Sequence, residues 1–348
     1  MTLLRYALAT LLALLPVPGA AQEDIAEFGS GATEMTLMST TDIAIIAPVM
    51  QRFADLNPDL LLRYEQWGSN ALFARSRAAC EGGGQGAPAD AILSSAVHHM
   101  VWLVNAACAH RYVSPRTSAL PPVRRWRDEV WGLTEEPAVI IYNKRALGGA
   151  EVPRSRFALL DLMREAPEAL RGRIATYDIA ASGLGYLFAH SDSLEASTFG
   201  AMLEGFARVD AVATCCSTEI IRGVADGQYD FAYNVLGSYV ASVAEPDVGV
   251  ILPEDYTLIL SRSYMIPRGA RQKEGATRLL DFLLSAEAQG MLAEIGLVMS
   301  ADADEHGLVP SARRLIALSP SLLVALDANT REGLFSIWNN AFSLGGSP

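Results

Sequence analysis

Short apolar strands alternate with helices along this sequence, and a hydroxyl or glycine residue stands at most of the joints between them. The joint Thr176–Phe188 connects a short strand to an apolar helix. Its Ser182 can cap the helix through the side-chain oxygen, while Gly183 and Gly185 let a ligand approach the backbone. The first N–H groups of a helix have no partners within it, and the helix dipole adds positive charge there, so a small anion can bind. An ordinary capped helix gives the same pattern, and the case for a binding site therefore depends on recurrence.

The arrangement recurs in the first third of the chain. Strands are predicted at residues 35–39, 61–64 and 88–93, and each is followed by a hydroxyl residue and a helix. Another joint lies at residues 227–239, where a strand ends in Asn-Val-Leu-Gly-Ser-Tyr. Such alternation predicts an α/β fold in which helix starts gather at the carboxyl ends of the strands, where ligands of open sheets bind.

Two stretches indicate passages between two domains. Residues 131–137 lead into the strongly β-like run 138–143, which we interpret as a crossover, and residues 255–266 are the expected return. The chain has 348 residues, 51% of them apolar, which is enough core-forming material for two domains. The predicted division is lobe one, residues 35–136 plus 259–345, and lobe two, residues 137–258.

The N-terminus has the features of a cleavable signal peptide. A basic start with Arg5 precedes the apolar run Tyr6–Leu15, which is too short to span a bilayer, and small residues follow up to Ala21. We predict cleavage after Ala21, a polar leader at residues 22–34, and a periplasmic location. No cysteine lies near the cleavage point to carry a lipid anchor.

Four cysteines in an exported chain make disulfides possible. Cys80 precedes a glycine-rich loop and Cys108 ends an apolar helix-like run, so a bridge between them would close that loop; the sequence leaves this pairing open. Cys215 and Cys216 are adjacent, and adjacent cysteines rarely bond each other because the geometry is strained. They are interpreted as small buried residues whose role stays open. No Cys-X-X-Cys motif supports a thioredoxin-like role.

A series of short phrases supports a family resemblance. They are Ser-Thr-Thr-Asp at 39–42, Ser-Ser at 94–95, Thr-Glu-Glu-Pro at 134–137, Val-Ile-Ile-Tyr-Asn at 139–143, Thr-Tyr-Asp-Ile at 176–179, Ser-Gly-Leu-Gly-Tyr at 182–186, Tyr-Asn-Val-Leu-Gly-Ser-Tyr at 233–239 and Asp-Tyr-Thr-Leu at 255–258. In this order and spacing they resemble periplasmic solute-binding proteins of the type II, ferric-ion and sugar-phosphate branch, in particular the phosphoglycerate-transport regulatory type. The resemblance covers Met35 to about Ile316. It implies two α/β lobes, joined by two hinge crossovers, that close on a ligand and present it to an ABC permease or a membrane sensor kinase.

Hydroxyl groups and backbone amides on both sides of a cleft suit an oxyanion without much formal positive charge. The predicted ligand-binding residues are Ser39, Thr40, Thr41, Ser69, Ser94, Ser95 and Thr134 from lobe one, and Ser182, Gly183, Tyr186, Tyr233, Asn234, Gly237 and Ser238 from lobe two. Arg262 or Arg173 would add a bidentate contact, unless they are solvated surface residues. The favoured ligand is a small phosphorylated or carboxylated metabolite. The net charge of −12 argues against a nucleic-acid partner, and a monomer is expected.

Ferric-ion binding is the alternative within the same fold. Ferric binders of this superfamily typically use a pair of adjacent tyrosines, and this chain has no Tyr-Tyr; Tyr233 and Tyr239 stand six residues apart. His98 and His99 are predicted at the surface or boundary of a helix. No metal site and no cofactor are therefore predicted.

An exported hydrolase is the alternative from another class. The sequence contains no G-x-S-x-G, no H-E-x-x-H and no P-loop motif. Glu135 and Glu136 form a carboxylate pair, but neighbours on a strand point to opposite faces and are unsuited to share a proton. The prediction is a binding protein with no catalytic residues.

Overall fold

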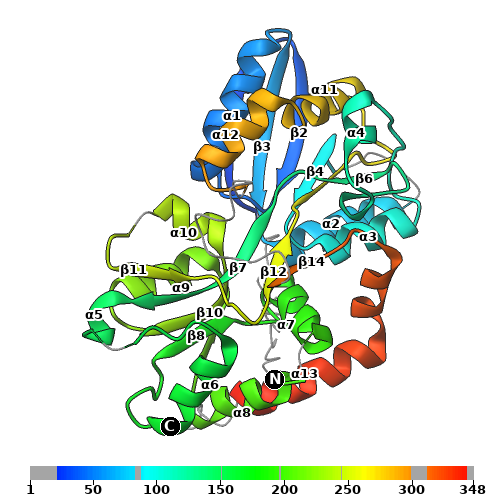
Figure 1. Cartoon of the computed structure of the whole chain (residues 1–348). Coiled ribbons are helices and arrows are strands. Elements are labelled where there is room, and N and C mark those ends of the chain that lie inside the picture. The colour runs from blue at the N-terminus through cyan, green and yellow to red at the C-terminus, as the bar shows by residue number, and fades with distance from the viewer. Residues whose placement is uncertain are drawn as a thin grey trace, which may run out of the picture.

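The computed structural model describes residues 22–82, 88–149, 151–195, 197–243, 245–298 and 312–342, and the predicted signal peptide lies outside these ranges. The chain forms two α/β lobes connected by two passages (Figure 1), which confirms the predicted fold class. Lobe one is named here for the sheet that contains β2, and lobe two for the sheet that contains β10. Among the described residues, no helix has the length and apolarity needed to cross a membrane.

The sheet of lobe one has the order β1-β3-β2-β4-β13-β6-β5. Its strands are β1 (Gln22–Gly29), β2 (Thr33–Ser39), β3 (Leu60–Trp67), β4 (Ala91–Ser94), β5 (Arg125–Trp126), β6 (Val130–Gly132) and β13 (Ser263–Met265). β2 runs parallel to β3 and β4, whereas β13 pairs antiparallel with β4 and β6. All four residues of β4 are buried, as expected for a central strand covered on both faces.

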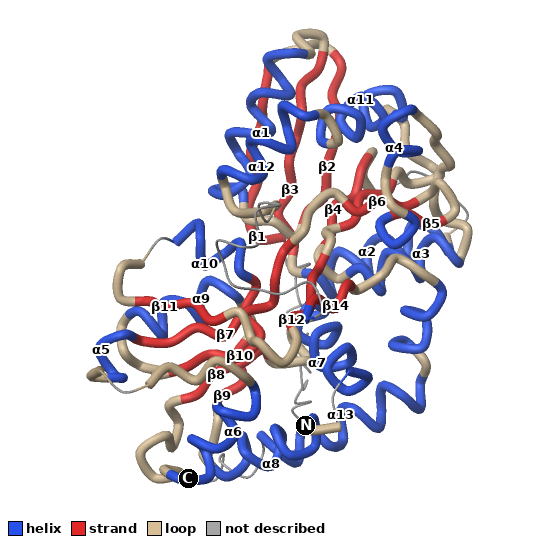
Figure 2. The backbone as a smooth tube through the Cα atoms, in the orientation of Figure 1, coloured by secondary structure: helices blue, strands red, loops and turns tan. Residues whose placement is uncertain are grey.

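Helices lie against the sheet of lobe one (Figure 2). They are α1 (Ile43–Leu56), α2 (Ser69–Glu81), α3 (Val97–Asn105), α4 (Pro115–Ala119), the 3-10 turn η1 (Pro122–Arg124), α11 (Lys273–Leu283) and α12 (Ala286–Glu294). α1 buries Ile46, Val49 and Phe53 at helical spacing. It begins at Ile43 and contains Pro48. It ends at Leu56, before Asn57-Pro58, because the residue that precedes a proline is disfavoured in helical geometry.

Lobe two has a mixed sheet in the order β14-β12-β7-β10-β8-β9, with β11 beside β7. Its strands are β7 (Glu136–Asn143), β8 (Ile174–Tyr177), β9 (Val212–Thr214), β10 (Phe231–Leu236), β11 (Val248–Ile251), β12 (Thr257–Leu260) and β14 (Arg313–Leu315). Its helices are α5 (Lys144–Leu147), α6 (Arg156–Glu165), α7 (Gly183–Glu195), α8 (Phe199–Arg208), α9 (Ser217–Ala225), α10 (Gly237–Val243) and α13 (Ala328–Phe342). The 3-10 helix η4 (Pro320–Leu326) precedes α13 and packs mainly against α3 of lobe one.

The two passages between the lobes run side by side. β6 leads into β7 through residues 133–135, and β12 leads back into β13 through residues 261–262. β7 and β12 pair antiparallel, with Ile259 opposite Pro137 and Leu260 opposite Glu136. The paired passages are the two predicted hinge crossovers.

Both ends of the described chain differ from the expected division. Residues 22–29 form the edge strand β1, paired antiparallel with β3, rather than a polar leader. An edge strand can keep polar side chains in solvent, and only Phe28 of β1 is buried, so the sequence showed little strand pattern.

At the other end, α13 packs against α8 and buries Trp338 in the core of lobe two, although residues 259–345 were assigned to lobe one. Which lobe a C-terminal helix covers depends on tertiary packing, which the sequence alone does not show.

Two disulfides are present in the described residues. Cys80, near the end of α2, bonds Cys108, just after α3, with a Cα–Cα distance of 5.5 Å. Cys215 and Cys216 also bond each other, which corrects their interpretation as small buried residues. Both stand between β9 and α9 and reach solvent rather than a core.

Candidate functional site

A cleft of about 480 Å³ lies between the two lobes. Its walls come from the loops that follow β2, β3, β4, β8 and β9, together with the starts of the helices behind them. The lining residues are Glu23, Thr40, Asp42, Gln66, Trp67, Gly68, Ser69, Asn70, Ala71 and Ser95 of lobe one, and Tyr177, Ala181, Ser182, Leu184, Cys215, Cys216, Ser217, Thr218 and Tyr239 of lobe two.

Four helices begin at this cleft, two from each lobe. Asp42 is the N-cap of α1, Ser69 is the first residue of α2, Ser182 precedes α7 and Ser217 begins α9. The Oγ of Ser182 accepts a hydrogen bond from the Gly185 N–H at 3.0 Å, which is the predicted cap. The positive ends of four helix dipoles therefore border one space, and none of the described residues that line it is a lysine or an arginine.

The lobes touch each other across the cleft in this structure. The Gly183 N–H donates to Ser69 Oγ at 2.9 Å, and Asn70 Nδ2 donates to the carbonyl of Ala181 at 3.0 Å. A Cβ at position 183 would lie 2.8 Å from Cε1 of His99, so only glycine permits this approach. These contacts make the structure a closed form.

Asp42 is the centre of a second set of contacts between the lobes. Its Oδ1 accepts from the Tyr239 hydroxyl at 2.9 Å, and its Oδ2 accepts from Thr218 Oγ1 at 3.3 Å. Burial raises the pKa of Tyr239, and burial likewise raises the pKa of Tyr177 to about 12. The Tyr177 hydroxyl lies 2.6 Å from Ser217 Oγ. Both tyrosines are therefore neutral hydrogen-bonding groups at neutral pH, not phenolates.

The structure brings part of the predicted site together. Thr40, Ser69, Ser95 and Ser182 line the cleft. Thr40 Oγ1 accepts from the Ser95 N–H at 2.9 Å, which ties two neighbouring loops of lobe one. The predicted Ser39, Ser94 and Gly183 lie directly behind this wall. Ser39 Oγ accepts from the Thr41 N–H and Ser94 Oγ from the Ala96 N–H, each at 3.1 Å, so these two hydroxyls shape turns.

Three other predicted residues surround a buried ion pair at the hinge. Glu136 and Arg262, both fully buried, form a bidentate pair at 2.8 and 3.1 Å. Thr134 Oγ1 and Ser238 Oγ donate to the Glu136 carboxylate, and Thr41 Oγ1 accepts from Arg262. Thr41, Thr134 and Ser238 thus complete the hydrogen bonding of the hinge and do not line the cleft.

Neither arginine that the sequence offered to an anion reaches the cleft. Arg262 is used by Glu136, and Arg173 bonds Asp230 at 2.6 Å and the Gln228 carbonyl at 2.9 Å. The expectation of a bidentate arginine contact was wrong. Sequence reasoning could not identify the carboxylates, distant in the chain, with which these two arginines pair.

The remaining predicted residues lie inside lobe two. Tyr233 donates to Asp192 at 2.8 Å and accepts from Arg156 at 2.7 Å, within a buried network that includes Asn234. The Tyr186 hydroxyl donates to the carbonyl of Ala325. Gly237 packs under Pro137 of the hinge, where a Cβ would meet the proline at 3.1 Å. Tyr186, Tyr233, Asn234 and Gly237 are therefore structural in this closed form.

The cleft residues that sequence reasoning missed are mostly at the same kind of joint. Asp42 and the pair Ser217-Thr218 stand at the starts of α1 and α9, and both face the cleft. Tyr177 is the last residue of β8 and faces the cleft from the end of that strand. The pattern of a strand followed by a polar residue and a helix start would have identified these residues. Trp67 and Glu23 carry no such signal in the sequence.

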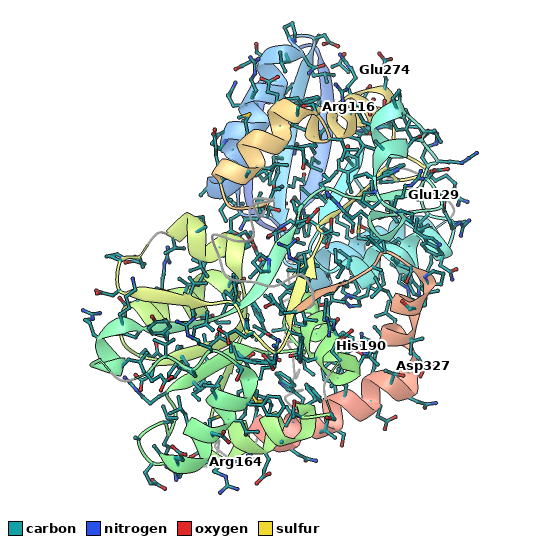
Figure 3. All side chains as sticks on the ribbon, viewed as in Figure 1. Arg116, Glu129, Arg164, His190, Glu274 and Asp327 are labelled. Atoms are coloured by element: carbon teal, nitrogen blue, oxygen red, sulfur yellow. A yellow bond between two sulfur atoms is a disulfide. The ribbon has the colours of Figure 1, made fainter. Side chains whose placement is uncertain are left out.

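His98 and His99 lie directly behind the cleft, not at a helix surface. They are 0% and 4% exposed, which corrects the prediction. The ring of His99 stacks on Phe73 of α2, and His98 lies beside Tyr186 of α7. His190 of α7 stacks on Tyr186, and η4 and α13 complete this interface near Asp327 (Figure 3). Burial lowers the pKa of His98 well below its usual value and lowers the pKa of His99 to about 3.

Comparisons with known proteins agree with this arrangement. A family model described as bacterial extracellular solute-binding protein matches residues 38–290. The substrate-binding protein of an ABC transporter from Agrobacterium tumefaciens is 29% identical, with a TM-score of 0.84 over 92% of this chain and 98% of that one. The periplasmic binding protein AfuA from Actinobacillus pleuropneumoniae, with fructose-6-phosphate bound, is 16% identical, with a TM-score of 0.68 over 90% and 100%.

A ferric-binding protein also shares the fold. Apo ferric ion-binding protein A from Pasteurella haemolytica is 19% identical, with a TM-score of 0.67 over 89% of this chain and 98% of that one. A search of curated protein sequences found no significant match.

Proposed function

This chain belongs to the family of bacterial extracellular solute-binding proteins, and from that premise we propose that it captures a small anionic metabolite, phosphorylated or carboxylated, by closing its two lobes. The observation that carries the proposal is the meeting of four helix N-termini, two from each lobe, at one cleft. An oxyanion held there accepts hydrogen bonds from both lobes, so its binding selects the closed form.

The uncharged side chains of the cleft support an oxyanion that is bound mainly by dipoles and hydroxyls. Ser69, Ser95, Ser182, Ser217 and Thr218 provide hydroxyl groups around the space. The carboxylate of Asp42 stands in the same wall and suits a hydroxyl group of the ligand. A phosphorylated or carboxylated compound that also carries hydroxyls fits this combination.

We place the protein in the periplasm as a monomer after cleavage at Ala21. The ligand would be passed to an ABC permease of the inner membrane, as in other proteins of the family, or reported to a sensor kinase. The proposal assigns no catalytic role to the chain. Phosphoesters incubated with the protein are expected to stay intact, with no release of inorganic phosphate.

A thermal-shift screen tests the ligand class. Phosphosugars, phosphoglycerates and dicarboxylates are compared with the uncharged parent compounds and with ferric citrate. A ligand at 100 times its Kd stabilises the folded state by about 2.7 kcal/mol, a readily measured rise in Tm. We expect such a rise with at least one anion and with none of the uncharged parents. A rise with ferric citrate alone would favour the iron-binding alternative, although the cleft tyrosines are held neutral by burial.

Substitution of Ser182 tests the cleft itself. Ser182→Phe places a ring in the space in front of α7, and we expect at least about a hundredfold loss of affinity, equivalent to about 2.7 kcal/mol, in calorimetry with the ligand found by the screen. The matched control is Ser155→Phe, because Ser155 caps α6 through Ala158 N–H outside the cleft. Each variant loses one helix cap, at a cost of about 1 kcal/mol in stability. Equal affinity in the two variants would remove Ser182 from the site.

A further inference from the structure

The disulfide between Cys215 and Cys216 forms part of the wall of the cleft, immediately before α9. We propose that it is a site of reversible thiol–disulfide exchange whose reduction loosens the closed form of the protein. The proposal concerns the closing contacts and does not depend on which ligand binds.

The two disulfides differ in their access to an attacking thiol. Cys215 and Cys216 face the cleft and are accessible to solvent. Cys108 is only 5% exposed and Cys80 is partly buried against the core of lobe one. Exchange requires direct approach of a thiolate to a disulfide sulfur, so the cleft disulfide is the one open to reaction.

The surroundings of the two sulfur atoms set the direction of the reaction. Cys215 Sγ lies 3.4 Å from Oε2 of Glu219, whose negative charge disfavours a thiolate at that sulfur. Cys216 is the N-cap of α9, where the helix dipole favours a thiolate. Attack on Cys215 with departure of Cys216 is therefore the favoured step.

The reductant is a dithiol, of the class that oxidoreductases with a Cys-X-X-Cys site provide. Its first thiolate bonds to Cys215 Sγ while the bond to Cys216 breaks, and Cys216 leaves as a thiolate that takes up a proton. The second thiol of the reductant then displaces Cys215 and forms an internal disulfide. The protein gains two thiols, and the reductant loses two electrons and two protons.

Reduction acts on two contacts of the cleft wall, one within lobe two and one between the lobes, because Ser217 and Thr218 follow the disulfide directly in the chain. Ser217 Oγ lies 2.6 Å from the Tyr177 hydroxyl, which also accepts from the Leu236 N–H. Thr218 Oγ1 donates to Asp42 of lobe one. The covalent ring at Cys215 and Cys216 restrains the backbone that leads into both contacts, and its opening releases that restraint.

The first experiment measures which disulfide is reduced. The full protein is equilibrated with graded ratios of reduced to oxidised dithiothreitol, alkylated with iodoacetamide, digested and analysed by mass spectrometry. EDTA is present because the sulfur atoms and Glu219 lie within 4.8 Å of one another and suit a metal ion once reduced. We expect Cys215 and Cys216 to become alkylated at a ratio of reduced to oxidised dithiothreitol at least about tenfold lower than the ratio that Cys80 and Cys108 require. This corresponds to a reduction potential about 30 mV higher for the cleft disulfide. The reverse order, or simultaneous reduction, would overturn the proposal.

The second experiment measures closure by hydrogen exchange. The double variant C215S/C216S removes the cleft disulfide, and C80S/C108S is the control that removes the other one. We expect peptides that cover residues 178–186 and 217–225 to exchange at least about tenfold faster in C215S/C216S, and at the wild-type rate in the control. Wild-type exchange of both peptides in C215S/C216S would show that the disulfide does not support closure.

Discussion

Replacing Glu136 by alanine is expected to destabilise the protein by about 3–5 kcal/mol, because it leaves the guanidinium of Arg262 buried without its partner. Thr134 and Ser238 lose the carboxylate to which they donate in the same step. Urea unfolding at pH 7, followed by circular dichroism, measures the effect.

The adjacent carboxylate provides the control. Glu135 forms an ion pair with Arg124 at 2.8 Å but is 34% exposed, so Glu135→Ala is expected to cost about 1 kcal/mol or less. The double variant E136M/R262M removes both buried charges and is expected to recover part of the stability of Glu136→Ala. Equal effects of the two alanine substitutions would show that the hinge pair contributes no more than a surface pair.

Acid is expected to destabilise the interface behind the cleft, because His99 is buried in its neutral form. Its pKa is about 3 in the folded protein and about 6.5 when unfolded. The unfolded chain binds the proton more readily than the folded protein does. The contribution of neutral His99 to the free energy of unfolding is therefore present in full above about pH 6.5 and is lost as the pH falls toward 3. Between pH 6.5 and 5 the loss is about 2 kcal/mol.

The variant His99→Phe keeps a ring against Phe73 and removes the titrating group. The difference in unfolding free energy between wild type and His99→Phe is expected to change by about 2 kcal/mol between pH 6.5 and 5. His110→Gln is the control, since His110 is outside this interface and its pKa is lowered less than that of His99. The same pH dependence in wild type and His99→Phe would mean that His99 is not the group responsible. Arg331 also lowers the pKa of His99, and His99, His190 and Arg331 together lower the pKa of the neighbouring His98 beyond the effect of burial.

The sequence predicted the fold well because its main signals are local. A strand, a hydroxyl residue and the start of a helix lie within a few positions of each other, and helix starts after parallel strands gather at one edge of a sheet. That reasoning placed Ser69, Ser95 and Ser182 at joints that the structure brings to one cleft. The two crossovers were visible as β-like runs at the expected separation.

Sequence reasoning was less successful where the outcome depends on distant partners. Ser238 and Tyr233 stand in phrases like those of the cleft, but their hydroxyls are used by Glu136 and Asp192, which lie 102 and 41 residues away. The polar edge strand β1 and the position of α13 on lobe two likewise depend on tertiary pairing. The bond between Cys215 and Cys216 depends on the local backbone, which residue identities alone did not reveal.

The most direct test of the central claim is a crystal structure of the protein with the anion that gives the largest thermal shift. The account predicts that the phosphate or carboxylate group lies within hydrogen-bonding distance of backbone amides at the starts of helices from both lobes, among α2, α7 and α9. An anionic group that contacts only one lobe, or that lies outside the cleft, would contradict it.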